Sequence, residues 1–541
     1  MMRKYHLIGS APFKRFNAGS LLLCIVCTSM AAVTLTNQKL DLSSSNVTLR
    51  SDHTLASVNG GTVTLSLDAP ILENEFLKVT LLPGWGGRVR SIIYKPTGNE
   101  ETNPGQIGGP NNIGTGNFFY DYLWVIGGYY PTIGPEHGKY FHLPWDWKVL
   151  TNTKDTVAIA MYQVDSIPWR QGYAGKFSGC YATNIQVEFI VRLVTGKTAY
   201  ETEVTLKNPD AKEKKYEYWE SCSMFPGNSG SSAGYEFITP ETKYQVDYWC
   251  TAVKAVEQSA GADNFVYLDK LRWLKNWPAA GILYGHNYPY NYWGVIDHND
   301  AHEEGIMRVC DNKTTIGVKV WGAPPSLFEI WAGTCNRFFS PATLGPNQAV
   351  SWKAWYTPTV GLTNVTDASE YMLVNLTTDK TAYDGNANDS VRVACQMFFV
   401  MPSGQSHARI RLEGGGSLQT IFDNTLTPDP VNGNAIKLGV PVKSVYNGTT
   451  KLTALFFDDA GRTLLSVNRP LTFTNAGTTV GIIPGQAAAP VRKAFIPGGK
   501  VYSLDGRLIN TLNNKKGVFL TYGNGGKIKK LIQLRTKETD K

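Results

Sequence analysis

Apolar and polar residues alternate in single steps along much of the chain, which predicts β-strands. The segments Ile185–Leu193 and Tyr200–Leu206 show this alternation most clearly. Antiparallel strands with one covered face have this pattern. Clear helical periodicity is scarce, and runs of β-branched and aromatic residues are interrupted by Gly, Pro, Asn and Asp. The chain is therefore expected to be all-β.

Residues 71–94 predict two strands joined by a tight turn at Pro83–Gly87. The glycines of this turn permit positive φ angles. Arg88 begins the second strand, and we expect it to orient the oxygens of a ligand. The alternative is that it pairs with a structural carboxylate.

The segment Leu327–Ala332 predicts a strand that carries an acid beside an indole. Glu329 and Trp331 share one strand face because side chains alternate. A sugar presents apolar C–H faces and hydroxyl groups, which suit stacking on Trp331 and proton transfer by Glu329. The alternative is a solvated glutamate beside an aromatic residue that packs sideways.

Long aromatic loops provide the other candidate side chains. The loop from Gly114 to Trp147 carries His137 and His142 among many aromatic residues, and loops of this length are often functional. The tryptophans expected to stack on a ligand there are Trp124, Trp145 and Trp147. The alternative is that the aromatic residues of this loop pack it onto the core.

Two later segments add candidate acids. Trp219-Glu220 precedes a Gly- and Ser-rich loop, and His286 lies among tyrosines in the segment from Trp273 to His302. We expect Glu220 or His286 to act as a proton donor. Trp293 and His298 follow as candidate ligand contacts.

The histidines His298 and His302 are four residues apart, which on a helix would suit zinc. Asn299, Asp300 and Gly305 favour a turn instead, so no metal is expected as a cofactor. A weaker alternative is a calcium ion near Asp297 and Asp300, because oxygen ligands in a turn suit that ion.

The composition and charge of the chain give no indication of nucleic-acid binding. The 541 residues include 14 Trp, 27 Tyr and 22 Phe, and only 18% of residues are charged. The net charge of +8 comes largely from basic residues near the two ends. There is no basic stripe suited to nucleic acid.

The first residues predict export. A basic opening, the apolar run Leu21–Cys27 and small residues ending at Ala32 resemble a secretory signal peptide. No later apolar run is long enough to span a membrane. Export permits disulfides, and Cys222 with Cys250 is the first candidate pair, although connectivity cannot be deduced from the sequence.

The stretch LENEFLKVTLLPGWGGRVRSIIYKPTGNE resembles the opening of the galactose-mutarotase-like superfamily, and in particular a bacterial domain family of undefined function often joined to tetratricopeptide repeats. The segments TLKNPDAKEKKYEYWES, GVIDHNDAHEEGIMRVCD and LFEIWAG…VSWKAWYTP also resemble that family. The resemblance implies a large antiparallel β-sandwich with a carbohydrate site on a concave sheet face. Mutarotases carry a histidine near the position of Glu220, and this chain has none there.

The rest of the sequence predicts further domains and terminal segments. The tail VYSLDGRLI…KGVFL…KKLI resembles the C-terminal sorting module of type IX secretion. The expected boundaries are 1–32 for the signal peptide, 33–68 for N-terminal strands, 69–367 for the mutarotase-like domain, 370–482 for an immunoglobulin-like β-sandwich, 483–494 for a linker and 495–541 for the sorting module.

These features favour an exported, polysaccharide-degrading enzyme that resembles glycoside hydrolases, secreted or attached to the cell surface through its tail. Its chemistry would use Glu329 as base or nucleophile, His286 or Glu220 as acid and Arg88 as an orienting cation. The alternatives are a polysaccharide lyase and a surface protein that binds glycans without chemistry. A weaker alternative is an exported mutarotase.

Overall fold

The computed structural model describes most of the chain. The described residues are 32–51, 55–103, 127–135, 137–167, 182–228, 233–247, 264–384, 390–402, 404–414, 417–441, 448–474, 501–503, 517–522 and 528–534. They form β-strands and three short 3-10 helices, and they contain no α-helix. No helix in this part of the chain has the length and apolar character needed to cross a bilayer. The expectation of an all-β fold is confirmed.

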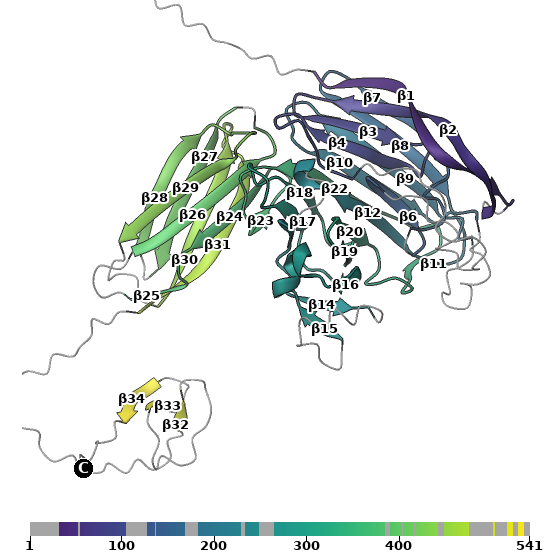
Figure 1. Ribbon diagram of the computed structural model, residues 1–541. Helices are drawn as coiled ribbons and strands as arrows, with labels where there is room; N and C mark the ends of the chain where they lie inside the picture. The colour runs from purple at the N-terminus through teal and green to yellow at the C-terminus, as the bar shows by residue number, and fades with distance from the viewer. Residues whose placement is uncertain are drawn as a thin grey trace, which may run out of the picture. The chain divides into compact units, whose positions relative to one another are not determined.

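The larger sheet has twelve strands (Figure 1). In spatial order these are β1 (Thr34–Leu49), β2 (Leu55–Glu73), β3 (Leu77–Leu82), β4 (Arg88–Tyr94), β6 (Tyr129–Ile133), β12 (Tyr218–Met224), β20 (Leu327–Gly333), β19 (Gly317–Ala323), β16 (Gly281–Gly285), β14 (Lys243–Val246) and β15 (Phe265–Tyr267), with β5 (Asn99–Glu100) paired to β4.

The smaller sheet of the same sandwich has eight strands. They are β13 (Tyr235–Ile238), β17 (Tyr292–Asp297), β18 (Gly305–Cys310), β22 (Ala349–Thr359), β10 (Tyr200–Lys207), β9 (Gln186–Val194), β8 (Thr156–Val164) and β7 (Asp146–Asn152). The connections include the ribbon of β11 (Lys214–Tyr216) and β21 (Ala342–Leu344) and the helices η1 (Pro226–Asn228), η2 (Asp269–Arg272) and η3 (Leu274–Asn276). Alternate residues of both sheets enclose one apolar core.

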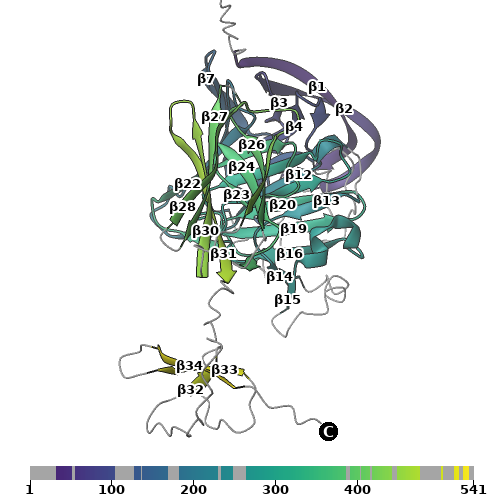
Figure 2. The same cartoon turned by 90° about the vertical axis from the view of Figure 1, so that its left-hand side faces the viewer.

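A second sandwich follows with its own core (Figure 2). Its four-stranded sheet contains β23 (Asp367–Ala368), β24 (Met372–Thr378), β26 (Ser390–Phe399) and β29 (Asn434–Pro441). Its five-stranded sheet contains β25 (Ala382–Asp384), β31 (Thr463–Thr474), β30 (Gly448–Asp458), β27 (Ser406–Gly414) and β28 (Ser417–Leu426). Only β25 pairs in parallel, with β31, among the described strands.

The chain divides into two compact units, residues 1–477 and 478–541. The second unit contains a three-stranded sheet of β32 (Val501–Ser503), β33 (Gly517–Tyr522) and β34 (Ile528–Leu534). The sorting module expected for residues 495–541, with its export role, stays a prediction.

The glycine turn between β3 and β4 is formed as the sequence predicts. Gly86 and Gly87 have φ angles of 76° and 59°, which side chains with a Cβ rarely adopt. A Cβ on Gly86 would lie 2.1 Å from the carbonyl oxygen of Phe141. The turn therefore has no room for a side chain.

Gly86→Ala is expected to lower the free energy of unfolding by about 2–4 kcal/mol, because backbone strain and a clash with the backbone of Phe141 add. Gly98→Ala is the matched control, since Gly98 has a φ of 82° and a Cβ there would meet nothing within 4 Å. Urea denaturation compares the two variants. Equal losses would mean that the clash at Gly86 is relieved at no cost.

The proposed disulfide between Cys222 and Cys250 is wrong for Cys222. This residue is a free thiol on the sandwich core side of β12, and it is fully buried. Burial raises the pKa of the thiol, which keeps it protonated. Cys250 lies outside the described residues.

Candidate functional site

A row of polar and aromatic residues crosses four neighbouring strands of the larger sheet. Tyr130 on β6, Ser221 on β12, Trp331 on β20 and Lys319 on β19 lie opposite one another in the strand register. Glu329 lies two residues before Trp331 and shares its face, as the alternation of the sequence predicts. This face points away from the smaller sheet, because Glu220, the neighbour of Ser221, contacts that sheet.

We call Tyr130, His137, Ser221, Lys319, Glu329 and Trp331 the outer-face cluster. Trp331 lies at its centre and is fully buried. The ammonium of Lys319 lies 4.1 Å from the centre of the Trp331 ring, and the ring of His137 is centred 5.2 Å from it. The ring of Phe338 meets the Trp331 ring edge-on at 5.4 Å. The expectation that Trp331 offers an open face to a sugar is therefore wrong.

Glu329 is the carboxyl group of the cluster, and 2% of its surface is exposed. Its Oε1 accepts a hydrogen bond of 3.3 Å from the Ser221 hydroxyl. Burial raises the pKa of Glu329, and the charge of Lys319 only partly opposes this effect. Glu329 can therefore keep a proton at a pH where an exposed glutamate has lost it.

Tyr130 and His137 are two further members of the cluster that can carry a proton. The Tyr130 hydroxyl and His137 Nδ1 share a hydrogen bond of 2.6 Å. Burial lowers the pKa of His137 well below its usual value, and the charges of Lys319 and Arg88 lower it further. The imidazole is therefore neutral near pH 7, half-buried and held in place through one ring nitrogen.

Arg88 lies beside Tyr130, but its guanidinium binds backbone carbonyls of the protein itself. Its guanidinium donates hydrogen bonds to the backbone carbonyls of Trp85 (2.8 Å), Gly127 (3.0 Å) and Phe141 (2.5 Å). It also lies 4.5 Å above the Tyr130 ring, and burial lowers its pKa to about 10. Its expected contact with a ligand is wrong for this arrangement, because the side chain is 3% exposed and binds loop carbonyls.

Glu220 on the larger sheet and Trp293 on the smaller sheet both point into the interior of the sandwich. Glu220 is fully buried and accepts hydrogen bonds from Arg308 Nη2 (3.0 Å) and from the Trp352 indole (2.8 Å). Trp293 is buried beside Arg308, whose guanidinium lies 5.5 Å from its ring. We expected Glu220 to act as the acid beside Glu329, and Trp293 to contact a ligand. Both expectations are wrong, because strand alternation points these two side chains into the core.

The remaining histidines of the aromatic loops are not part of the cluster. His286 follows β16 and meets Phe265 edge-on at 5.8 Å. Burial and the charge of Arg337 lower its pKa. His142 is buried against Phe141 and Trp85. Trp124 lies outside the described residues.

His298 lies between two carboxylates. Its Nδ1 is 2.6 Å from Glu303 Oε2 and its Nε2 is 2.9 Å from Glu236 Oε2. Its ring also packs on Trp273, with centroids 4.8 Å apart. Both ring nitrogens are therefore engaged within the protein, which corrects the expectation that His298 binds a ligand.

The carboxylates proposed for calcium have backbone partners. Asp297 Oδ1 accepts the amide of Asn299 at 3.0 Å, and Asp300 Oδ1 accepts the amide of His302 at 2.7 Å. In the part of the chain that the structure describes, no group of three or more His, Cys, Asp and Glu is arranged to hold a metal ion. A calcium ion near Asp297 and Asp300 stays a prediction without geometric support.

The stability of the sandwich is expected to depend on His298 protonation. Burial alone would lower the His298 pKa, but the hydrogen bonds and charges of Glu236 and Glu303 raise it. A raised folded-state pKa means that the contribution is complete below the unfolded value, about 6.5, and is lost as the pH rises through the folded-state value. Wild type should lose more stability than His298→Gln as the pH rises from about 6.5 into the alkaline range. Thermal melting across that range checks this, and parallel pH profiles would contradict it.

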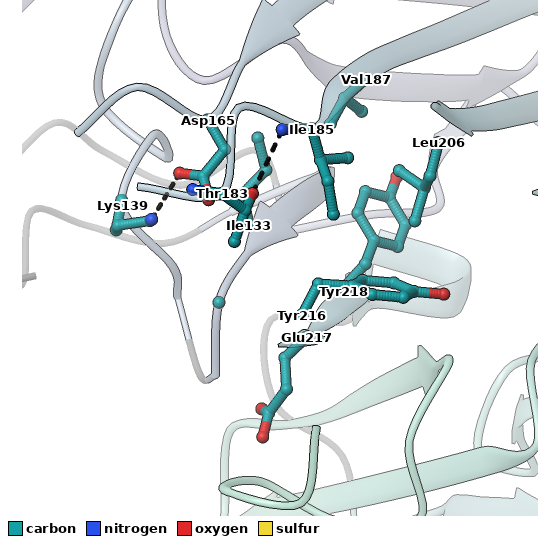
Figure 3. Close-up of a pocket in the computed structure, with 11 residues that line it drawn as sticks. Ile133, Lys139, Asp165, Thr183, Ile185, Val187, Leu206, Tyr216, Glu217 and Tyr218 are labelled. Atoms are coloured by element: carbon teal, nitrogen blue, oxygen red, sulfur yellow. Dashed lines mark hydrogen bonds and ion pairs between the residues drawn. The ribbon is translucent and has the colours of Figure 1, made fainter. Parts of the chain in front are cut away.

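A separate small cavity contains a buried ion pair but no room for a sugar (Figure 3). Lys139 and Asp165 form the ion pair, and Asp165 also accepts hydrogen bonds from the amide and hydroxyl of Thr183. The Glu217 side chain points away from this pair (Figure 3). The free volume is about 10 Å³, which is at the lower limit for one water molecule.

Sequence reasoning missed Tyr130, Ser221 and Lys319. Lys319 and Trp321 alternate with two valines in the run VKVW and so share one strand face, which could have been assigned once that strand was recognised. That Lys319 lies beside Trp331 is known only from the pairing register of their two strands. No local signal in the sequence indicates that Tyr130 lies opposite Ser221.

No protein-family model matches the chain, and a search of curated proteins finds no match. Solved structures give weak similarities. A tetratricopeptide-domain-containing protein from Parabacteroides distasonis shows 13% identity and a TM-score of 0.45, covering 61% of this chain and 56% of that protein. The chain thus spans about half the length of that protein.

Two further structures are similar over most of their own length. A galactose mutarotase-like protein from Clostridium acetobutylicum shows 10% identity and a TM-score of 0.38, covering 54% of this chain and 96% of its own. An aldose epimerase homologue from C. elegans shows 9% identity and a TM-score of 0.34, covering 60% of this chain and 99% of its own. Likeness at this level says nothing about activity, which must be inferred from the residues of the outer-face cluster.

Proposed function

We propose that the chain is an exported carbohydrate-active enzyme that acts on a polysaccharide or oligosaccharide, with its chemistry at the outer-face cluster. One observation carries the proposal. A buried carboxyl group with a raised pKa, Glu329, shares the strand face of Trp331, and a neutral histidine with a lowered pKa, His137, has its ring centred 5.2 Å from the Trp331 ring. Proton donors and acceptors with shifted pKa values are typical of catalytic sites.

In this proposal Glu329 is the acid and His137 is the base. Glu329 would give its proton to the glycosidic oxygen as the bond to the anomeric carbon breaks. His137 would take a proton from the water that attacks that carbon, and Tyr130 would fix the imidazole through Nδ1. These roles replace those first expected for Glu329 as base or nucleophile, for Glu220 or His286 as acid and for Arg88 as an orienting cation.

A second candidate function is glycan binding without chemistry. It is favoured by the burial of Glu329 and Trp331, since a sugar reaches neither side chain without rearrangement. Lyase chemistry is a variant of the enzymatic proposal, in which His137 removes a proton next to a uronate.

Incubation of the protein with neutral and uronate-bearing polysaccharides distinguishes these functions. New reducing ends without unsaturation support hydrolysis, and absorbance from a new double bond supports a lyase. Retention on a glycan gel without any product supports binding alone. No product and no retention on any polysaccharide would reject a role with polysaccharides.

Export is part of the proposal and rests on residues 1–32 and on the tail, 495–541, which we propose directs the protein to the cell surface or medium. Intact mass spectrometry of protein from the medium and from the cell surface tests both segments. Protein that remains inside the cell with residues 1–32 intact would contradict it.

A further inference from the structure

A hollow of about 550 Å³ lies on the second sandwich, over the neighbouring strands β24, β26 and β29 (Figure 1). Three consecutive residues of each strand line it. Strand alternation places two of each three on the face away from the sandwich core, which the residues between them, such as Val393, enter. We call the six outward residues the basic hollow. They form two rows across the sheet, with Thr377, Ala394 and Lys437 in one row and Asp379, Arg392 and Gly439 in the other.

The floor of the basic hollow is made of small residues. Ala394 is the middle residue of its row, and Gly439 lies on the edge strand β29. A Cβ on Gly439 would meet nothing within 4 Å. The hollow has a volume in the range of about 300–1,000 Å³ that is usual for a ligand site. A ligand can therefore approach the sheet between the longer side chains of Arg392 and Lys437.

The sheet face that carries the hollow is covered only toward one end. Leu373 and Phe398, which lie opposite each other on that face, belong to the apolar core of the first sandwich. Arg392, Lys437 and Gly439 lie toward the other end and are exposed. The hollow is thus open to a ligand from solvent, and it is separate from the outer-face cluster.

The basic hollow carries two cations without counter-charges. Among the described residues, neither the guanidinium of Arg392 nor the ammonium of Lys437 takes part in a hydrogen bond or an ion pair. The two residues are diagonal neighbours on β26 and β29, and such positions lie about 7–8 Å apart. The carboxylate of Asp379 is engaged elsewhere, because its Oδ1 accepts the Tyr383 hydroxyl at 2.8 Å and the backbone amide of Arg392 at 3.1 Å. The hollow therefore favours a negatively charged ligand.

We propose that the basic hollow binds a polysaccharide whose charges are carboxylates, as in a chain of uronate units. This inference rests on the proposed function for the polysaccharide class, and it adds the charge of that polysaccharide. The guanidinium of Arg392 offers parallel N–H donors that match the two oxygens of a carboxylate. Lys437 supplies a second charge one diagonal step away, so the acids of a repeating chain can meet both cations. Ala394 and Gly439 leave room for a sugar ring between them.

Affinity electrophoresis of the full chain tests the hollow, in gels that contain polygalacturonate, neutral galactan or dextran sulfate. Wild type and the control Lys451→Gln, which removes an exposed positive charge from another sheet of the second sandwich, should be retarded most by polygalacturonate. Arg392→Gln and Lys437→Gln should each weaken this binding at least about fivefold, because each removes a charge-assisted hydrogen bond. Gly439→Leu should weaken it without a change of charge, since the new side chain fills the open floor.

Equal retardation of Arg392→Gln and Lys451→Gln by polygalacturonate would overturn the proposal. Retardation of wild type by galactan alone or by dextran sulfate alone would also overturn it. Thermal melting of each variant shows whether it is folded, and the three hollow variants change different residues, so each is an independent test.

Release of reducing ends by wild type measures the proposed function separately. Wild type that releases reducing ends but is not retarded by polygalacturonate rejects the role of the hollow and leaves the proposed enzyme intact. Retardation that depends on Arg392, without product from any polysaccharide, supports the role of the hollow and rejects the enzymatic proposal.

Discussion

Arg308→Met lowers the free energy of unfolding of the first sandwich by about 3–5 kcal/mol. Arg308 and Glu220 join the two sheets inside the core, with side chains 1% and 0% exposed. Arg308 Nε also donates to the Tyr356 hydroxyl at 3.1 Å. Removing the guanidinium leaves the Glu220 carboxylate buried beside apolar groups without its counter-charge, and this is the main source of the loss.

Two companion variants make the test specific. Arg192→Met removes a half-exposed arginine that pairs with Glu201, and it should cost no more than about 1 kcal/mol. The double variant Arg308→Met with Glu220→Met removes both charges and should be more stable than Arg308→Met alone. Chemical denaturation followed by tryptophan fluorescence measures all three. A double variant less stable than the single one would show that the loss comes from packing and not from the lone carboxylate.

Glu329→Gln is expected to reduce turnover of the polysaccharide at least about 100-fold, because glutamine cannot supply the proton that leaves with the glycosidic oxygen. The exposed Glu213→Gln is the control and should retain full turnover. Release of reducing ends measures both variants. Full activity of Glu329→Gln would reject the proposed acid, and binding without any turnover in wild type would favour the glycan-binding alternative.

The same variant has a stability signature. The folded-state pKa of Glu329 lies above that of an unfolded glutamate, so the wild-type protein loses stability as the pH rises through the raised value. Glutamine does not ionise and avoids this loss. Glu329→Gln should therefore be at least as stable as wild type at pH 7, which separates a loss of activity from a loss of folding.

Single-residue alternation was sufficient to predict the all-β class and one face of the site, whereas the sandwich architecture was expected from the family resemblance. The pairing of Glu329 with Trp331 on one strand face follows from local spacing, and so does the glycine turn before Arg88. The burial of that face was not predictable, because Lys319 and Phe338 cover Trp331 from other parts of the chain.

The wrong predictions for Glu220 and His298 arose because the pairing of distant strands could not be predicted from the sequence. Glu220 and Ser221 are neighbours, and only the pairing of β12 with β6 and β20 and the position of Arg308 determine which of them enters the core. The sequence gives no indication that Glu220 meets Arg308, 88 residues further along the chain. His298 similarly meets Glu236 through the pairing of β13 and β17, which brings distant segments together.

The strand β12 therefore carries two independent sets of positions. Its even-numbered residues, such as Glu220 and Cys222, hold the sandwich together, whereas its odd-numbered residues, such as Ser221, contact the outer-face cluster. A one-residue insertion or deletion in this strand would exchange the two sets, so engineering of this protein should vary side chains on β12 and never its length.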